Sequence, residues 1–527
     1  MNALISILPV VLLFVLMLGF KVSGWKSALI TLIATVGLAL WGAPAMGIIP
    51  AQYASDSVYS LVGWSVVEGA LKAVFPILII ILMAIYSYNV LVESKAIEVI
   101  KSQFTSFTDD RGILVLMMVW GFGGLLEGMA GFGTAVAIPA AILIGLGFKP
   151  MFSALVALLG NTVATGFGAV GVPITTLCNE ISSGAASSAT ICEVSTFAII
   201  QLSPLFILIP FTILMLTDKK AWMKNVCIAV WVGGISLAVQ LLCATLLGAE
   251  TPAILGSIAA ILALIVYDRL FIPRRKASSS SGPRYSFAET MKAWSVYILI
   301  LVLILVGGAL CPPVESFLKS HLVSSFPIPV VGSTFKFGWI SNAGVMLFIG
   351  SIAGGLIQGL SVSRLAAVMA KTIFNLRFTT ITIISLIALA SVMNHSGMIA
   401  ALAAGLVAIS GSFYPFFAPL IGAIGTFVTG SDTSSNILFG KLQANVAHQL
   451  GMTGQTSVCG FTGSETDWLA ASNTAGATGG KMISPQSIAI ATAACDMEGK
   501  DDAILRKAIP YSLAYIIICG LIVILGC

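Results

Sequence analysis

Residues 470–486, AASNTAGATGGKMISPQ, decide the fold of this chain, because an earlier stretch, LLGNTVATGFGAVGVPI (residues 158–174), has the same layout. The alignment places Asn161 on Asn473, Thr162 on Thr474, Gly168 on Gly480 and Pro173 on Pro485. Just upstream, EGMAGFGT (127–134) and TGSDTSSN (429–436) occupy matching places. Each half of the chain therefore carries a tip of small residues followed by an Asn-Thr motif, which predicts an internal repeat.

Apolar runs surround both stretches along the whole chain. Of the 527 residues, 58% are hydrophobic and 9% are charged, and the mean hydropathy is +1.04. An average soluble domain carries about 25% charged residues, so this composition cannot cover a soluble surface. It excludes a soluble enzyme with one tether and predicts an all-α polytopic membrane protein. The 52 glycines and 20 prolines fall largely inside the apolar runs, which predicts interrupted helices and re-entrant hairpins.

The apolar runs set the number of membrane elements. A spanning helix needs about 20 apolar residues, which gives about 12–14 membrane elements in this chain. Candidate spans lie at 4–20, 26–42, 72–92, 112–126, 151–168, 195–216, 226–247, 253–271, 294–311, 339–360, 378–394, 413–428 and 508–526. Shorter or glycine-rich pieces lie at 131–147, 433–449, 468–480 and 486–495.

Lysine and arginine gather in alternate loops between these spans. The loops 43–63, 176–194 and 312–338 hold only Lys319 and Lys336 of the 26 basic residues. The positive-inside rule therefore places the other set of loops in the cytoplasm and both termini outside. The net charge of +5 reflects this topology, so membrane lipid is the expected partner and a nucleic acid is not.

Opposite entry sides make the repeat an inverted one. The segment before Glu127 starts inside, whereas the segment before Asp432 starts outside. The basic, serine-rich stretch RRKASSSSGPR (274–284) is typical of a flexible linker. We therefore expect a first half at 1–273 with repeat 1 at about 64–175, a cytoplasmic linker at 274–292, and a second half at 293–527 with repeat 2 at about 378–498.

Inverted repeats with interrupted helices are typical of secondary transporters, whose substrate sites lie at the broken segments. Helix N-termini at such breaks present free N–H groups and a positive dipole end, which suit a small carboxylate. The alternative is that the small residues only let helices pack closely, but their presence at related positions in both halves favours binding. The expected substrate-binding residues are Gly131, Gly133, Thr134, Asn161, Thr162, Ser431, Thr433, Ser472, Asn473, Thr474 and Lys481.

Glu127 and Asp432 are the candidate proton carriers. An ionised carboxylate at membrane depth costs about 2.5–3.5 kcal/mol, so such residues are functional candidates by default. The alternative for Asp432 is a role as the N-cap of the helix that follows it. Lys481 has Ala169 at the equivalent place in the first half. It could pair with a substrate carboxylate or with Asp432, or it could extend its ammonium towards the membrane surface.

Other titratable residues have more ordinary explanations. Glu68 and Lys72 are four residues apart, which predicts a helical ion pair. His395 is expected to be a hydrogen-bonded structural residue, with a functional role as the alternative. Cys178 and Cys192 could form a disulfide, but small apolar packing is favoured. The nine cysteines and three histidines show no metal-binding spacing, so no metal and no cofactor is expected.

Four motifs resemble those of the lactate permease family of bacterial transporters. They are LLEGMAGFGTAVAI (125–138), GLGFKP (145–150), GSDTSSN (430–436) and NTAGATGGKMISPQSIAIA (473–491). The resemblance implies proton-coupled uptake of lactate, and of glycolate in several members, across the cytoplasmic membrane. It also implies a distant similarity to the larger ion-transporter superfamily. A sodium-coupled carboxylate symporter is the alternative, because Asn-Thr loops with backbone carbonyls also suit Na⁺. An enzyme is not expected, because no G-x-S-x-G or H-E-x-x-H motif occurs.

Overall fold

The structure is a computed structural model that describes most of the chain. The described residues are 2–20, 22–53, 55–105, 108–131, 133–182, 185–272, 285–307, 311–321, 323–332, 334–340, 342–495, 497 and 500–527. Residues 274–284 of the predicted linker lie outside these ranges, as does Phe132 of the first tip.

Long apolar helices dominate the molecule. Within the described residues, nine helices are long and apolar enough to cross a bilayer, or up to eleven if each of two bent pairs is one span. The bent pairs are Pro150–Gly160 with Val163–Ile181, at 48°, and Ser188–Leu202 with Leu205–Thr217, at 43°. Three shorter apolar helices cover Asn2–Met17, Thr134–Gly145 and Gly344–Ile357. The structure thus has the all-α, multi-pass architecture with interrupted helices that the composition predicts.

Sixteen α-helices come before residues 273–284 and ten follow them within the described residues. The first set is α1 (Asn2–Ser6), α2 (Leu8–Phe14), α3 (Gly24–Gly37), α4 (Ala43–Met46), α5 (Val58–Lys72), α6 (Ile79–Glu93), α7 (Ala96–Thr105), α8 (Arg111–Leu116), α9 (Gly123–Met129), α10 (Thr134–Gly145), α11 (Pro150–Gly160), α12 (Gly168–Ile181), α13 (Ser188–Leu202), α14 (Leu205–Thr217), α15 (Trp222–Leu247) and α16 (Pro252–Phe271). The second set is α17 (Phe287–Gly307), α18 (Pro312–Ser320), α19 (Ala343–Ile357), α20 (Val362–His395), α21 (Met398–Ser410), α22 (Tyr414–Thr429), α23 (Asp432–Gln449), α24 (Glu465–Lys481), α25 (Pro485–Ala494) and α26 (Asp501–Leu525).

Three helices depart from the predicted spans. The span expected at 72–92 begins at Val58, and it joins α5 to α6 across a kink at Phe75. The Glu68–Lys72 pair lies within it. Helix α12 extends to Ile181, into residues assigned to a loop at 176–194, and it buries Thr176, Leu177 and Cys178 there. Helix α21, which has 13 residues, joins α22 in one candidate span at Met398–Thr429, so that span begins before the one expected at 413–428.

Two re-entrant hairpins approach the middle of the molecule. In the first, α9 and α10 pack against each other, and Gly131 and Gly133 at φ +62° and +86° turn the chain between them. In the second, α22 and α23 pack together, with Gly430 at φ +73° in the turn. These left-handed conformations favour glycine, which explains the small-residue tips of both motifs.

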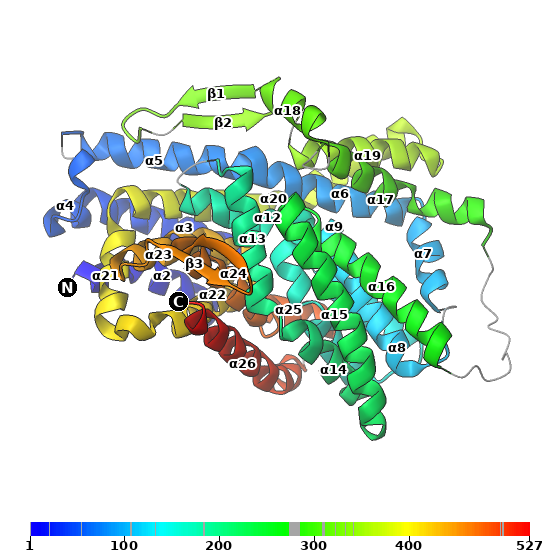
Figure 1. The fold of residues 1–527 in the computed structure, drawn as a ribbon. Coiled ribbons are helices and arrows are strands. Elements are labelled where there is room, and N and C mark those ends of the chain that lie inside the picture. The colour runs from blue at the N-terminus through cyan, green and yellow to red at the C-terminus, as the bar shows by residue number, and fades with distance from the viewer. Residues whose placement is uncertain are drawn as a thin grey trace.

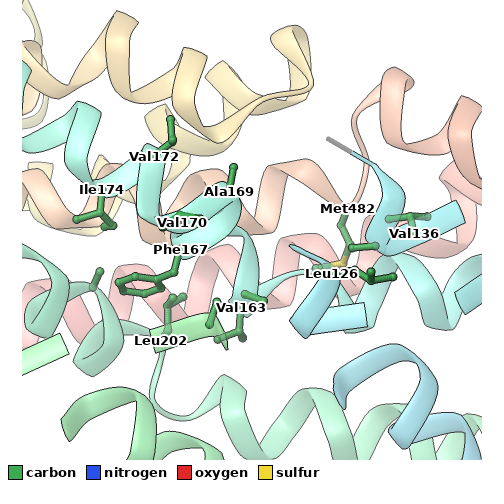
Figure 2. Close-up of a cluster of buried hydrophobic side chains, with 14 of the residues drawn as sticks. Leu126, Val136, Val163, Phe167, Ala169, Val170, Val172, Ile174, Leu202 and Met482 are labelled. Atoms are coloured by element: carbon green, nitrogen blue, oxygen red, sulfur yellow. The ribbon is translucent and has the colours of Figure 1, made fainter. Parts of the chain in front are cut away.

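A broken helix follows each hairpin. The first runs from α11 through an irregular stretch into α12, where Ala169, Val170 and Gly171 all have positive φ. The second runs from α24 into α25 and is interrupted only at 482–484. Buried apolar side chains gather around these segments, with Phe167 and Val170 near Leu202 and with Met482 near Leu126 (Figure 2).

Two short β-hairpins lie in polar loops where no strand was predicted. β1 (Val323–Pro327) pairs antiparallel with β2 (Thr334–Gly338), and β3 (Gln455–Val458) with β4 (Phe461–Ser464). The β1–β2 hairpin lies over α5 (Figure 1), and its Phe337 packs against Phe75. Near β3, the Thr456 hydroxyl donates to the Gly526 carbonyl at 2.8 Å, which holds the C-terminus at this end of the molecule.

Glycines of the second Asn-Thr motif bring α22 and α24 into backbone contact. A Cβ added at Gly476 would lie 1.7 Å from the Pro419 carbonyl oxygen, and one at Gly480 would lie 2.2 Å from that of Ala423. From the other side, a Cβ added at Gly422 would lie 2.0 Å from the Asn473 carbonyl oxygen. The packing alternative for small residues therefore holds for these glycines.

Candidate functional site

A cavity of about 450 Å³ lies between the two hairpin tips and the broken helices. Gly131, Gly133 and Ser431 to Ser434 line it together with the start of α25. Trp25 of α3 and Phe378 of α20 close it laterally, with their rings stacked at 5.3 Å. The cavity therefore receives residues from both halves of the chain.

The helices α10, α23 and α25 begin at this cavity. Gly133 is the N-cap of α10 and makes no side-chain cap, while the first turns of α23 and α25 line the cavity with Asp432 to Ser434 and with Pro485 to Ser487. Free N–H groups and the positive ends of helix dipoles stabilise an anion at such a place. The arrangement suits a small carboxylate.

Glu127 and Lys481 form an ion pair across the two halves at the cavity wall. The Lys481 Nζ lies 2.6 Å from Glu127 Oε1, and both residues line the cavity. The other oxygen, Glu127 Oε2, is buried and has no hydrogen-bond partner among the described residues. Gly168 makes room for the carboxylate, because a Cβ there would lie 2.8 Å from Oε1. The partner of Lys481 is thus Glu127, which the sequence reasoning did not predict.

Asp432 lies at the start of α23 with only 3% of its surface exposed. Neither of its carboxyl oxygens has a hydrogen-bond partner in the described part of the chain. Ser431 is the N-cap of α23, because its hydroxyl accepts from the Ser434 N–H at 3.2 Å. The alternative reading of Asp432 as that N-cap is therefore wrong, and its side chain is left facing the cavity.

The second Asn-Thr motif does not line the cavity. Asn473 donates to Asn436 Oδ1 at 2.9 Å and accepts from Gln443 at 3.3 Å. Asn436 in turn donates to Thr474 at 2.6 Å and to the Pro173 carbonyl at 3.0 Å. This buried network joins α23, α24 and α12, so it positions the tips. Ser472 also faces away, with its hydroxyl on the Leu469 carbonyl.

The first Asn-Thr motif lies at the helix break, also outside the lining of the cavity. Asn161 Oδ1 is buried and has no partner among the described residues. The Thr162 hydroxyl donates to the Leu159 carbonyl at 2.9 Å, and that of Thr134 donates to the Gly131 carbonyl at 2.8 Å within the tip. Thr165 does line the cavity, and its hydroxyl donates to the Asn161 carbonyl.

Several cavity residues escaped the sequence reasoning. They are Thr165, Gly168, Gly430, Ser434, Gln486 and Ser487, together with Thr379 and Thr382 of α20. The sequence signal was present for Gln486 and Ser487, which follow the proline shared by both repeats. Nothing comparable marks the α20 threonines, because only the packing of a distant helix brings them here.

The other residues that the sequence singled out lie away from this cavity. The Glu68–Lys72 pair is confirmed at 3.1 Å, and His395 is hydrogen-bonded as expected. Cys178 and Cys192 are free thiols in the structure. Among the described residues, no group of three or more His, Cys, Asp or Glu side chains could hold a metal ion.

Comparison with known sequences shows a match to one protein family. Residues 2–527 match the profile of a family described as L-lactate permease. An L-lactate permease of Streptococcus iniae is 39% identical over 73% of this chain and 80% of its own length. The glycolate permease GlcA of Escherichia coli is 32% identical over all of this chain and 95% of its own length. The L-lactate permease of Bacillus subtilis is 31% identical over all of this chain and 96% of its own.

Two solved structures share the fold at low sequence identity. The YdaH transporter of Alcanivorax borkumensis matches with a TM-score of 0.52 and 14% identity, over 94% of this chain and 98% of its own. MtrF of Neisseria gonorrhoeae, from a class of antimetabolite efflux pumps, matches with a TM-score of 0.50 and 12% identity, over 94% of each chain. At such identities the likeness concerns the fold alone.

Proposed function

The chain belongs to the L-lactate permease family, and on this premise we propose that it is a proton-coupled symporter of small 2-hydroxymonocarboxylates, chiefly lactate and glycolate. Membership makes it a multi-pass transporter and not an enzyme. The names of its relatives, L-lactate permease and glycolate permease, support this substrate class. We place it in the bacterial cytoplasmic membrane with both termini outside and the two halves as inverted repeats.

The observation that carries the proposal is the Glu127–Lys481 pair in a cavity where α10, α23 and α25 begin. A substrate carboxylate that enters can take Lys481 as its cation and the free N–H groups of α23 and α25 as donors. Glu127 then loses its partner in a buried place, where an unpaired charge is costly. It binds a proton, so the anion and the proton are carried together.

Charge balance makes this cycle electroneutral. With Asp432 protonated, Glu127 and Lys481 cancel in the empty cavity. One carboxylate and one proton on Glu127 leave the sum unchanged, which avoids the cost of moving net charge through the membrane. Asp432 in its neutral form can donate a hydrogen bond to the substrate, which is consistent with two oxygens that otherwise have no partner among the described residues.

Uptake of radiolabelled L-lactate into proteoliposomes tests the proposal. We expect an inward pH gradient alone to drive accumulation, and Glu127→Gln to abolish accumulation while retaining part of the lactate exchange. Glu93→Gln is the matched control, because it removes the same group from an exposed pair with Arg364. Accumulation by Glu127→Gln at the wild-type level would contradict the role of Glu127.

The other tip carboxylate needs a separate arm of the same assay. Asp432→Asn keeps the shape of a neutral acid, so we expect it to retain pH-driven uptake. If Asp432→Asn retains only exchange while Glu127→Gln accumulates lactate, Asp432 is the proton carrier instead.

Sodium coupling is the second candidate, favoured by one observation. Asn161 Oδ1 is a buried oxygen at an unwound segment and has no hydrogen-bond partner among the described residues, and Na⁺ prefers such oxygen ligands. A sodium gradient at equal pH decides between the two candidates. Accumulation only with sodium would replace the proton by Na⁺, and no uptake of lactate or glycolate under either gradient would overturn the substrate class.

A further inference from the structure

A second buried polar cluster lies outside the central cavity, where α20 ends beside α5. His395 Nε2 lies 2.7 Å from Glu68 Oε2, and the Ser391 hydroxyl donates to the same oxygen at 2.7 Å. Lys72 pairs with the other oxygen, Oε1, at 3.1 Å. Glu68 is 1% exposed and His395 is 9% exposed. The transport cycle proposed above uses none of these groups.

Tyr53 continues the cluster towards the β1–β2 hairpin. Its hydroxyl oxygen lies 3.0 Å from His395 Nδ1 and 3.4 Å from the carbonyl oxygen of Val331. Val331 belongs to the turn at 328–332, which follows β1. The chain of contacts therefore runs from a carboxylate between two membrane helices, through an imidazole and a phenol, to a surface turn.

The acceptors in this series of contacts fix the number of hydrogen atoms that it needs. The Val331 carbonyl can only accept, so a hydrogen bond there uses the single phenolic hydrogen of Tyr53. The Tyr53 oxygen must then accept from His395 Nδ1–H. The contact between Nε2 and Glu68 needs a hydrogen as well. All three contacts are hydrogen bonds only if the His395–Glu68 pair holds one proton more than a neutral imidazole and a carboxylate.

That proton belongs on the imidazole. Glu68 is surrounded by donors, because Lys72 contacts Oε1, and Ser391 and His395 contact Oε2. A carboxylate with three donors, one of them an ammonium, is stabilised in its ionised form. An imidazolium donates from both ring nitrogens, which matches the two acceptors that flank the ring.

Other charged groups near the cluster come from several elements, and they include both acidic and basic side chains. They are Asp56 before α5, Glu180 of α12, Lys336 of β2 and Lys441 of α23. In the described part of the chain, Glu68 is the acid in hydrogen-bond contact with the His395 ring.

We propose that His395 is a second proton-binding site, which in this conformation holds an imidazolium between Glu68 and Tyr53. A cavity of about 450 Å³ lined by Tyr53, Val331, His395 and Lys441 gives the proton a route to the ring. This site goes beyond the proposed transport function, whose coupled proton is on Glu127.

Loss of this proton changes the bond at the turn. A neutral ring keeps its Nε2 hydrogen on Glu68, so Nδ1 becomes an acceptor for the Tyr53 hydroxyl. Tyr53 has one hydrogen and must then release the Val331 carbonyl. Tyr53 thus transmits the protonation state of a buried histidine to the turn at 328–332, which borders the cavity.

Nitrogen NMR of the whole protein in lipid bilayers tests the site directly. The chain has three histidines, so ¹⁵N-histidine labelling gives three rings, and His395→Gln identifies the relevant signal. An ordinary solvated imidazole is about 10% protonated at pH 7.5. We expect the His395 ring to show two protonated nitrogens at pH 7.5 and to become neutral in Glu68→Gln. His448→Gln is the matched control, because that histidine is exposed.

A neutral His395 ring in the wild-type protein at pH 7.5 would overturn the proposal. This measurement needs no transport activity, so it stands whether or not lactate is the substrate. An imidazolium that persists unchanged in a folded Glu68→Gln protein would also overturn it.

Hydrogen exchange at constant pH tests the link to the turn. Tyr53→Phe removes the bond to Val331, so we expect exchange of the amides in 328–332 to become several-fold faster. Tyr59→Phe is the control, because Tyr59 is 69% exposed. Equal exchange in Tyr53→Phe and the wild type would refute the link.

Discussion

The two Asn-Thr motifs align in sequence but have different structural roles. In the first half, Asn161 and Thr162 mark the end of α11, and the chain stays irregular until Gly171. In the second half, Asn473 and Thr474 lie inside an unbroken α24, and the interruption comes at 482–484. A motif that occurs in both halves of the chain therefore does not place its residues equivalently.

The difference follows from what packs against each motif. The second motif faces α22, and its glycines leave room for the backbone of that helix to approach closely. Helix α24 therefore stays regular through the contact. The first motif has Ala164 where the second has Gly476, and it continues into the left-handed residues Ala169 and Val170. Such conformations cost about 1–3 kcal/mol each, so the first break stores strain that the second does not.

The largest effect is expected where the second motif packs. Gly476→Ala puts a Cβ 1.7 Å from the Pro419 carbonyl, so α22 and α24 must separate. We expect a loss of about 3 kcal/mol or more in stability, or failure to fold, measured by thermal unfolding in detergent. Ala164→Gly at the aligned position of the first half should leave a folded protein. Equal stability of Gly476→Ala and the wild type would remove the distinction between the two motifs.

Lys481 is the next test, because the first half has Ala169 in its place. Lys481→Gln leaves Glu127 without its cation and removes the proposed partner of the substrate carboxylate. Breaking a buried pair costs about 3–5 kcal/mol, so we expect uptake and exchange of lactate to fall about 100-fold or more. Lys224→Gln, which breaks a pair with Asp110 away from the cavity, should transport normally. Exchange at the wild-type rate in Lys481→Gln would exclude it from substrate binding.

The two asparagines should separate stability from transport. Asn473→Ala removes the hydrogen bonds of Asn473 to Asn436 and Gln443. We therefore expect a loss of about 2 kcal/mol in stability. Asn161→Ala removes an oxygen with no hydrogen-bond partner among the described residues, so its unfolding temperature should stay near that of the wild type. Its uptake should then show whether Asn161 contributes to a ligand or ion site. The reverse order of unfolding temperatures would contradict the assigned roles.

The smallest effect is expected at the second hairpin tip. Ser431→Ala removes the cap on the Ser434 N–H, which costs about 1 kcal/mol. The first tip has no such cap at Gly133. We expect a modest fall in unfolding temperature with uptake largely retained. A fall as large as that of Asn473→Ala would mean that the tip, and not the buried network, holds the second hairpin together.

Sequence reasoning reached the hairpin tips more reliably than the segments behind them. Gly131, Gly133, Ser431 and Asp432 line the cavity because glycine turns and helix starts are local features that a short motif determines. Asn473 and Thr474 do not line it, because their orientation depends on which face of α24 packs against α23. The threonines of α20 and the wall formed by Trp25 come from helices that no motif connects to the tips.

By itself, the sequence determined that this protein is a multi-pass helical membrane transporter with two re-entrant tips. Hydropathy and glycine position act locally, so the chain reveals them directly. Only the tertiary structure decided that Lys481 pairs with Glu127, that Ser431 and not Asp432 caps α23, and that His395 lies between Glu68 and Tyr53. These contacts join residues far apart in the chain, and only the packing of helices from both halves brings such groups within hydrogen-bond distance.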